Sequence, residues 1–269
     1  MPPKFHFIFQ VKEASNAEEA LLELSTFLTD PYEINDPETG VIQIGGYSEQ
    51  QTPSLPWSHV ILEETSPIEE INWQQQWTDF APHFHEGLSH IDLGGPILLL
   101  KPGSGFGDLS HPTTRLVLTL MASHVKDNIV FDIGCGSGIL TIASILLGAK
   151  KAYGIDIEEG ALKHSLENAA LNHVEEKTAF AKQIDPSWLP QEPCVIVMNM
   201  IASEQKIAWE SLPQLHSQKA ILITSGLLSS QKDHYLQLTK DWGWSLIDEK
   251  EEEGWSGFVL KKNTPREFP

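Results

Sequence analysis

A glycine-rich loop between two apolar segments constrains the fold of this chain more than any other feature. The run Ile129–Ile133 is apolar except for Asp132, which is typical of a strand buried on both faces of a sheet. It continues into Gly134-Cys135-Gly136-Ser137-Gly138, and a helix is expected over Gly138–Leu147. Alternate glycines let the backbone turn sharply and approach a ligand closely. The loop therefore predicts a ligand site at the carboxyl end of a strand.

A second acidic residue indicates what that ligand is. Asp156 ends the next expected strand, eighteen positions after Gly138. A carboxylate at this edge of a sheet can accept hydrogen bonds from ribose hydroxyls. The glycine spacing is G-x-G-x-G, which differs from the dinucleotide fingerprint G-x-G-x-x-G. Loop and carboxylate together predict a nucleoside site, and the alternative is a tight turn in another doubly wound fold.

Strands and helices are expected to alternate through the second half of the chain. Such alternation predicts a parallel sheet with helices on both faces, and hence an α/β fold. The expected strands are Ile129–Ile133, Ala152–Asp156, Thr178–Gln183, Val195–Met198, Ala220–Ile223 and a terminal antiparallel pair, Trp244–Asp248 and Gly257–Lys261. The expected helices are Gly138–Leu147, Glu158–Asn172, a segment capped by Ser203, and Ser229–Lys240.

The chain is expected to begin with a small α+β domain over residues 1–65. Its expected strands are Lys4–Val11, Val41–Tyr47 and Trp57–Glu63, and its expected helix is Ala17–Leu28. Asn16 is expected to cap this helix, and Asp30-Pro31 to end it.

A connector helix is predicted over residues 66–82, with Pro67 in its first turn. Trp73 and Trp77 are four residues apart and would share one face. The remaining residues, 83–269, form the second predicted domain.

Charge restricts the partners that we expect. The 269 residues have a formal net charge of −19, and the first 80 residues hold 2 basic and 14 acidic side chains. An acidic surface repels phosphates and anionic lipids, so neither a nucleic acid nor a membrane is an expected partner. It suits a basic protein partner.

The remaining composition is typical of an intracellular protein. The chain has 2 cysteines, too few for a disulfide framework, and no leader-like apolar core at its start. Its longest apolar stretch, around Ile139–Leu147, is too short to span a membrane. We therefore expect a cytoplasmic protein, and a monomer.

Two further segments resemble one enzyme family. Lys101–Thr114 contains Pro-Gly-x-x-Phe-Gly and then His111-Pro112-Thr113-Thr114, and Asn199-Met200-Ile201-Ala202 follows the fourth expected strand. Together with the loop at Gly134 and with Asp156, they resemble the PrmA family. That resemblance implies a class I S-adenosylmethionine-dependent methyltransferase, Rossmann-like with a mostly parallel seven-stranded sheet. It also implies methyl transfer to amines, lysine and/or N-terminal, of a basic ribosomal protein, protein eleven of the large subunit.

The resemblance also implies roles for individual residues. The cofactor-binding residues that it implies, with those of the glycine loop, are Phe106, Thr114, Asp132, Gly134, Gly136, Asp156 and Asn199. Asn199 would also be the catalytic residue, because it would lie beside the reactive sulfonium and orient the amine. Two segments depart from the family pattern, namely Gly107-Asp108-Leu109-Ser110 and Ser203-Glu204-Gln205.

Several features have alternative interpretations. Asn199 is either a site residue or a helix N-cap, and His111 is either part of a turn or a base. His83, His85, Glu86 and His90 do not have the spaced second pair of a metal site, so no metal is expected. The alternative functions are methylation of another protein or a small molecule, and a cofactor-binding assembly or regulatory factor without catalysis.

Overall fold

The computed structural model describes residues 5–35, 39–51, 57–67, 83–103, 107, 109 and 111–263. The chain divides into two compact units, Met1–Ile71 and Asn72–Pro269. Phe106, Asp108 and Ser110 lie outside the described residues, as do Trp73 and Trp77 with most of the predicted connector.

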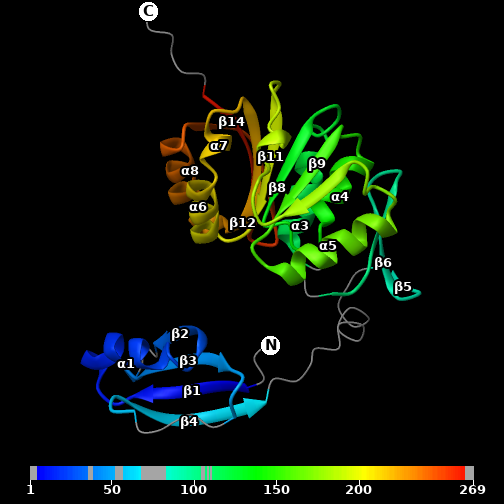
Figure 1. Ribbon diagram of the computed structural model, residues 1–269. Coiled ribbons are helices and arrows are strands. Elements are labelled where there is room, and N and C mark those ends of the chain that lie inside the picture. Colours follow the sequence, from blue (N-terminus) through cyan, green and yellow to red (C-terminus); the bar gives the residue numbers. More distant parts are fainter. Residues whose placement is uncertain are drawn as a thin grey trace, which may run out of the picture. The chain divides into compact units, whose positions relative to one another are not determined.

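The first unit is a four-stranded antiparallel sheet with one helix (Figure 1). The strand order is β2-β3-β1-β4, formed by β1 (Phe5–Val11), β2 (Thr29–Asn35), β3 (Ile42–Ser48) and β4 (Val60–Pro67). After the 3-10 turn η1 (Ala14–Asn16), α1 (Ala17–Leu24) packs on the sheet. Alternate β1 side chains face this core, where Phe7, Phe9, Leu24 and Ile44 are fully buried.

The structure corrects four local predictions in this unit. Asp30-Pro31 lies inside β2, a strand that the sequence analysis missed, because proline is tolerated on an edge strand. The helix ends at Leu24, and Asn16 makes no side-chain capping bond. Pro67 ends β4 and so does not begin a helix.

A short three-stranded antiparallel sheet begins the described part of the second unit. It contains β5 (Phe84–His85), β6 (Leu88–Asp92) and β7 (Ile97–Leu100), none of which the sequence analysis predicted. The rings of His85 and His90 stack with centroids 3.7 Å apart. Among the described residues no group of three or more His, Cys, Asp or Glu side chains is placed to hold a metal ion.

The large sheet of the second unit has the order β10-β9-β8-β11-β12-β14-β13. Its strands are β8 (Ile129–Ile133), β9 (Lys151–Ile155), β10 (Thr178–Ala181), β11 (Cys194–Asn199), β12 (Ala220–Leu228), β13 (Trp244–Glu252) and β14 (Trp255–Lys262). All neighbours from β10 to β12 are parallel, and β14 is antiparallel to both β12 and β13. The predicted α/β fold with a mostly parallel seven-stranded sheet is therefore confirmed.

Helices cover both faces of this sheet (Figure 1). One face carries α3 (Pro112–Met121), α4 (Ile139–Leu146) and α5 (Glu159–Leu171), and the other carries α6 (Ala202–Ser211), α7 (Pro213–His216) and α8 (Lys232–Asp241). The 3-10 turns η2 (Pro186–Trp188) and η3 (Ser229–Gln231) complete the described elements. Successive β11 residues alternate between the two cores, so Val195 and Val197 face α3 and α4 whereas Ile196 and Met198 face α6.

Polar side chains of α5 and of its C-cap residue hold the end of β7 and the residue that follows it. Asn172 bonds the backbone N–H and C=O of Leu99, at 2.9 and 2.7 Å, and Asn168 Oδ1 accepts the Lys101 N–H at 2.9 Å. One turn earlier, His164 Nε2 donates to the Lys101 carbonyl at 2.7 Å, and burial lowers the pKa of His164. These contacts give the loop after Leu100 a fixed starting point.

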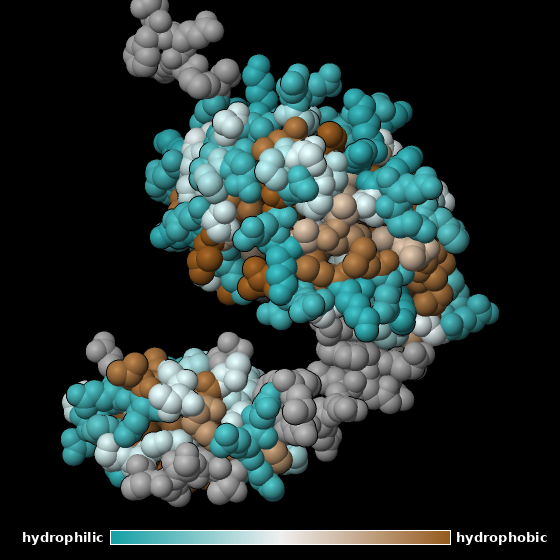
Figure 2. All heavy atoms as spheres, viewed as in Figure 1, coloured by the Kyte–Doolittle hydropathy of each residue, from teal (hydrophilic) through white to brown (hydrophobic). Residues whose placement is uncertain are grey.

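The visible surface is mainly hydrophilic, with separate hydrophobic patches (Figure 2). The exposed large apolar residues of the second unit include Ile157, Ile201, Ile207, Leu228 and Ile247. Within the described residues, none of the helices has the length and apolar character that crossing a membrane requires.

Candidate functional site

The glycine loop turns through backbone conformations that favour glycine. The φ angles of Gly134, Gly136 and Gly138 are +73°, +53° and +80°. The N–H groups of Gly134 and Cys135 donate to the Ile155 carbonyl at 2.7 and 3.1 Å, which ties the loop to β9. The loop therefore bends at the carboxyl edge of β8 and starts α4 from Gly138.

Asp156 lies directly against this loop. Its Oδ2 accepts the Gly136 N–H at 2.9 Å, and its Oδ1 accepts the Glu158 N–H at 2.9 Å. The predicted pairing of loop and carboxylate is thus present in three dimensions, although which atoms a ligand contacts is a proposal.

Ile157 is a candidate that the sequence analysis missed. It follows Asp156 at the end of β9, and its side chain is 81% exposed. An apolar side chain exposed to water beside a carboxylate that is expected to bind ribose suits a planar base. The sequence signal that could have identified it is an isoleucine directly after the acidic residue at the strand end.

Asp132 lies beneath the loop and is 1% exposed. Its Oδ2 accepts a bond of 2.7 Å from the Thr141 hydroxyl, and its Oδ1 is buried without a hydrogen-bond partner among the described residues. Burial raises the pKa of Asp132 to about 7; the Thr141 bond opposes this rise, and the nearby Asp156 charge adds to it. The group therefore titrates close to neutral pH.

Asn199 and Thr114 meet beside the glycine loop. Asn199 ends β11, and its Nδ2 donates to Thr114 Oγ1 across 3.3 Å. Its Oδ1 is buried and has no hydrogen-bond partner among the described residues. The N-cap interpretation is wrong, because α6 starts after Ile201.

Nearby capping residues also differ from expectation. Ser203 lies within α6 and does not cap it. His111 is the N-cap of α3, because its side chain accepts from the Thr113 N–H, and its ring lies 4.6 Å from that of Trp255 between centroids. This geometry supports its role in the turn.

The loop before α3 is attached at two described points. Ser137 Oγ donates to the Gly107 carbonyl at 2.7 Å, and Arg115 Nη1 donates to the Leu109 carbonyl at 2.9 Å. Arg115 also pairs with Glu252 at 2.6 Å and with Glu253 at 2.8 Å in the β13–β14 turn. The loop is therefore joined to both the glycine loop and the distant hairpin.

These residues fit S-adenosylmethionine. A carboxylate beside backbone turns suits the ribose, and exposed Ile157 suits the adenine. The Asn199 oxygen, unpartnered within the described part of the chain, is an acceptor where β11 ends. The strands β9, β8 and β11 are neighbours in the sheet, which brings these groups to one edge (Figure 1).

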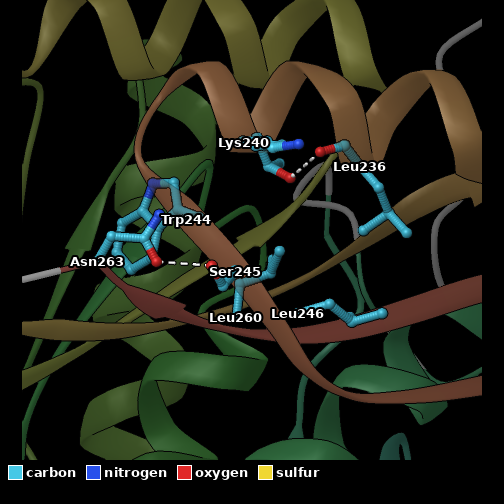
Figure 3. A pocket seen from close by; sticks show the side chains of 8 residues that line it. Leu236, Lys240, Trp244, Ser245, Leu246, Leu260 and Asn263 are labelled. Carbon is cyan, nitrogen blue, oxygen red and sulfur yellow. Dashed lines mark hydrogen bonds between the residues drawn. The ribbon is translucent and has the colours of Figure 1, made fainter.

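A separate hollow of about 280 Å³ lies elsewhere on this unit (Figure 3). Side chains from α8, β13 and β14 line it, including Lys240, Trp244 and Ser245. Ser245 Oγ donates to Asn263 Oδ1 at 2.6 Å across its rim. Its lining has no residue in common with the candidate site.

Comparison with known proteins gives a consistent result. The family model described as Ribosomal protein L11 methyltransferase (PrmA) matches residues 35–263. The chain is 40% identical over 179 residues to the Ribosomal protein L11 methyltransferase of Neisseria meningitidis serogroup B, covering 65% of this chain and 57% of the relative. It is 39% identical over 233 residues to that of serogroup C, covering 82% of this chain and 75% of the relative.

A solved structure agrees with these sequence matches. The crystal structure of ribosomal protein L11 methylase from Lactobacillus delbrueckii subsp. bulgaricus has a TM-score of 0.53 and 29% identity, covering 70% of this chain and 93% of that one. The chain therefore belongs to the PrmA family of ribosomal protein L11 methyltransferases, which use S-adenosylmethionine.

Proposed function

We propose that this chain transfers methyl groups from S-adenosylmethionine to amines of ribosomal protein L11, on lysine side chains and/or the N-terminus. The observation that carries the proposal is the Asn199 oxygen, which has no hydrogen-bond partner among the described residues, at the same sheet edge as the Gly134 loop and Asp156. The relatives' names supply the substrate.

The residues divide the work of this reaction. The cofactor supplies a methyl group already activated on a sulfonium, so no metal is required. Asp156 would hold the ribose hydroxyls, the loop from Gly134 to Gly138 would hold the methionine part, and Thr114 steadies Asn199. Asn199 Oδ1 accepts a hydrogen bond from the amine and aligns it. The amide is no strong base, so removal of water from the amine must lower the amine pKa.

The acidic first unit suits capture of a basic protein. We propose residues 1–65 as the recognition domain, 66–82 as the connector and 83–269 as the methyltransferase domain. Opposite charges accelerate encounter, and the same acidity disfavours nucleic acid. A monomer working in the cytoplasm completes the proposal.

Transfer of label from tritiated cofactor tests the function. The wild-type chain, incubated with separated ribosomal proteins, should label L11. Label on other proteins or on metabolites would support the alternative substrate, and cofactor binding without transfer would support a non-catalytic factor. Asn199→Ala, which removes the proposed orienting oxygen, serves as the negative control.

A further inference from the structure

A fully buried glutamine lies just beyond the candidate site. Gln205 is in the first turn of α6 and is 0% exposed. It falls in Ser203-Glu204-Gln205, the segment that departs from the family pattern. A buried amide is costly unless its two donors and its carbonyl oxygen are all satisfied.

Two hydroxyl groups satisfy the carbonyl oxygen. Thr224 of β12 donates to Gln205 Oε1 at 2.7 Å, and Tyr235 of α8 donates to the same atom at 2.5 Å. The two hydroxyl oxygens are 3.0 Å apart, and both residues are 0% exposed. The helices α6 and α8 and the strand β12 therefore meet at a single atom.

Two backbone carbonyls satisfy the amide nitrogen. Gln205 Nε2 donates to the Met200 carbonyl at 2.7 Å and to the Ser225 carbonyl at 2.9 Å. Carbonyl oxygens can only accept hydrogen bonds, so the two carbonyls must face the Gln205 nitrogen, and this fixes the orientation of the amide. The amide thereby joins the turn after β11 to the middle of β12.

Met200 connects this amide to the site. Its carbonyl packs on Gly226, whose φ is +102° and where a Cβ would overlap that carbonyl. The Met200 methyl packs on Gly134, where a Cβ would overlap it. Asn199 precedes Met200 directly, so the residue whose carbonyl Gln205 holds follows the amine-orienting residue and packs its side chain on the glycine loop.

We propose that Gln205 is a positioning residue for methyl transfer. Its amide holds the Met200 carbonyl, one residue beyond Asn199, and so restrains the backbone that sets the direction of the Asn199 oxygen. This inference rests on the proposed function, since that oxygen matters only if an amine is methylated. The cofactor loop has its own bonds to Ile155 and Asp156, so cofactor affinity depends on Gln205 much less than turnover does.

Two substitutions in the full chain separate positioning from packing. Gln205→Leu removes both hydrogen-bonding groups, and Gln205→Glu keeps the shape and the acceptor while losing the amide donors. Each should lower kcat on L11 by about 10- to 100-fold, because a misplaced orienting group is costly. The calorimetric affinity for S-adenosylmethionine should change much less.

A matched control removes a buried polar contact outside this network. Thr239 of α8 is 0% exposed, and its hydroxyl donates to the Leu236 carbonyl at 3.1 Å. Thr239→Val should lower the melting temperature and leave kcat unchanged. Loss of kcat in the Gln205 variants would then not be a consequence of lower stability.

The Met200 methyl signal provides a test that requires no turnover. The chain has 4 methionines, so a methyl NMR spectrum with labelled methionine is simple to assign. Both Gln205 variants should shift or broaden the Met200 signal and leave that of buried Met121 unchanged. An unmoved Met200 signal, or wild-type kcat in both variants, would overturn the inference. A wild type that methylates nothing refutes the proposed function instead, and the Met200 signal then still shows whether Gln205 holds Met200 in place.

Discussion

The candidate site lies along one sheet edge, and its two halves are held in place by different kinds of contact. The half at β8 and β9 depends on backbone: positive-φ glycines, and an Asp156 carboxylate that accepts main-chain N–H groups. The half at β11 and β12 depends on side chains, with the Gln205 amide joining Met200 to Ser225. In the proposed function the first half binds the cofactor, whereas the second sets the direction of one oxygen on Asn199.

Removing that oxygen should give the largest effect. Asn199→Ala should lower kcat by about 100- to 1,000-fold, in the range found when one preorganised polar group at a reacting centre is deleted. Single-turnover rates with saturating cofactor measure this change. A rate within a few-fold of wild type would remove Asn199 from the catalytic role.

The second prediction concerns the backbone half and pH. Asp132 ionises near 3.8 when unfolded and near 7 when folded, so the unfolded chain holds fewer protons between these values. The free energy of unfolding should therefore fall as pH rises from about 4 to about 7, by about 3 kcal/mol, relative to Asp132→Asn. Denaturant unfolding of both proteins across this range measures it, and parallel curves would contradict the assigned burial cost.

The third prediction separates backbone strain from ligand binding. Gly138 and Gly254 have φ angles of +80° and +79°, but a Cβ at Gly138 lies 3.0 Å from Ser165 whereas one at Gly254 meets open space. Both alanine variants should lose about 1–2 kcal/mol of stability from strain. Only Gly138→Ala should also weaken cofactor binding, as calorimetry would show; equal affinities would mean that the loop tolerates the change.

The smallest effect is expected at Arg115, which joins the loop before α3 to the β13–β14 hairpin. Arg115→Gln breaks the contacts to Glu252 and Glu253, which are partly exposed, and should cost about 0.5–1 kcal/mol. The loss should shrink in high salt. Lys150→Gln is the control, because its pair with Glu192 is 3.9 Å long and highly exposed. Equal melting temperatures for the two variants would show that the ion pairs of Arg115 add no stability.

The sequence predicted the backbone half well because its signals are local. Ile129–Ile133 matches β8 residue for residue, and the Gly134 loop and Asp156 meet as expected. Asn199 was identified by resemblance, and only the fold explains its contact with Thr114, 85 positions away.

The side-chain half could not be predicted in the same way. Gln205 lies 20 positions from Ser225 and 30 from Tyr235, and no local pattern marks such partners. Similarly, the edge strand β2 was missed because Asp30-Pro31 is typical of a helix end. A proline can lie in an edge strand, where its missing N–H costs no hydrogen bond within the sheet.

In the proposed function, the Gly134 loop and Asp156 form the binding site for S-adenosylmethionine. Calorimetric titration of wild type, Asp156→Ala and Asp92→Ala tests it most directly. Asp92 also accepts backbone N–H groups, at 2.8 and 3.2 Å, but in the β6–β7 turn. Asp156→Ala should lose about 2–3 kcal/mol of binding free energy, and Asp92→Ala should bind as wild type does. No binding by wild type, or equal affinity in all three proteins, would contradict the account.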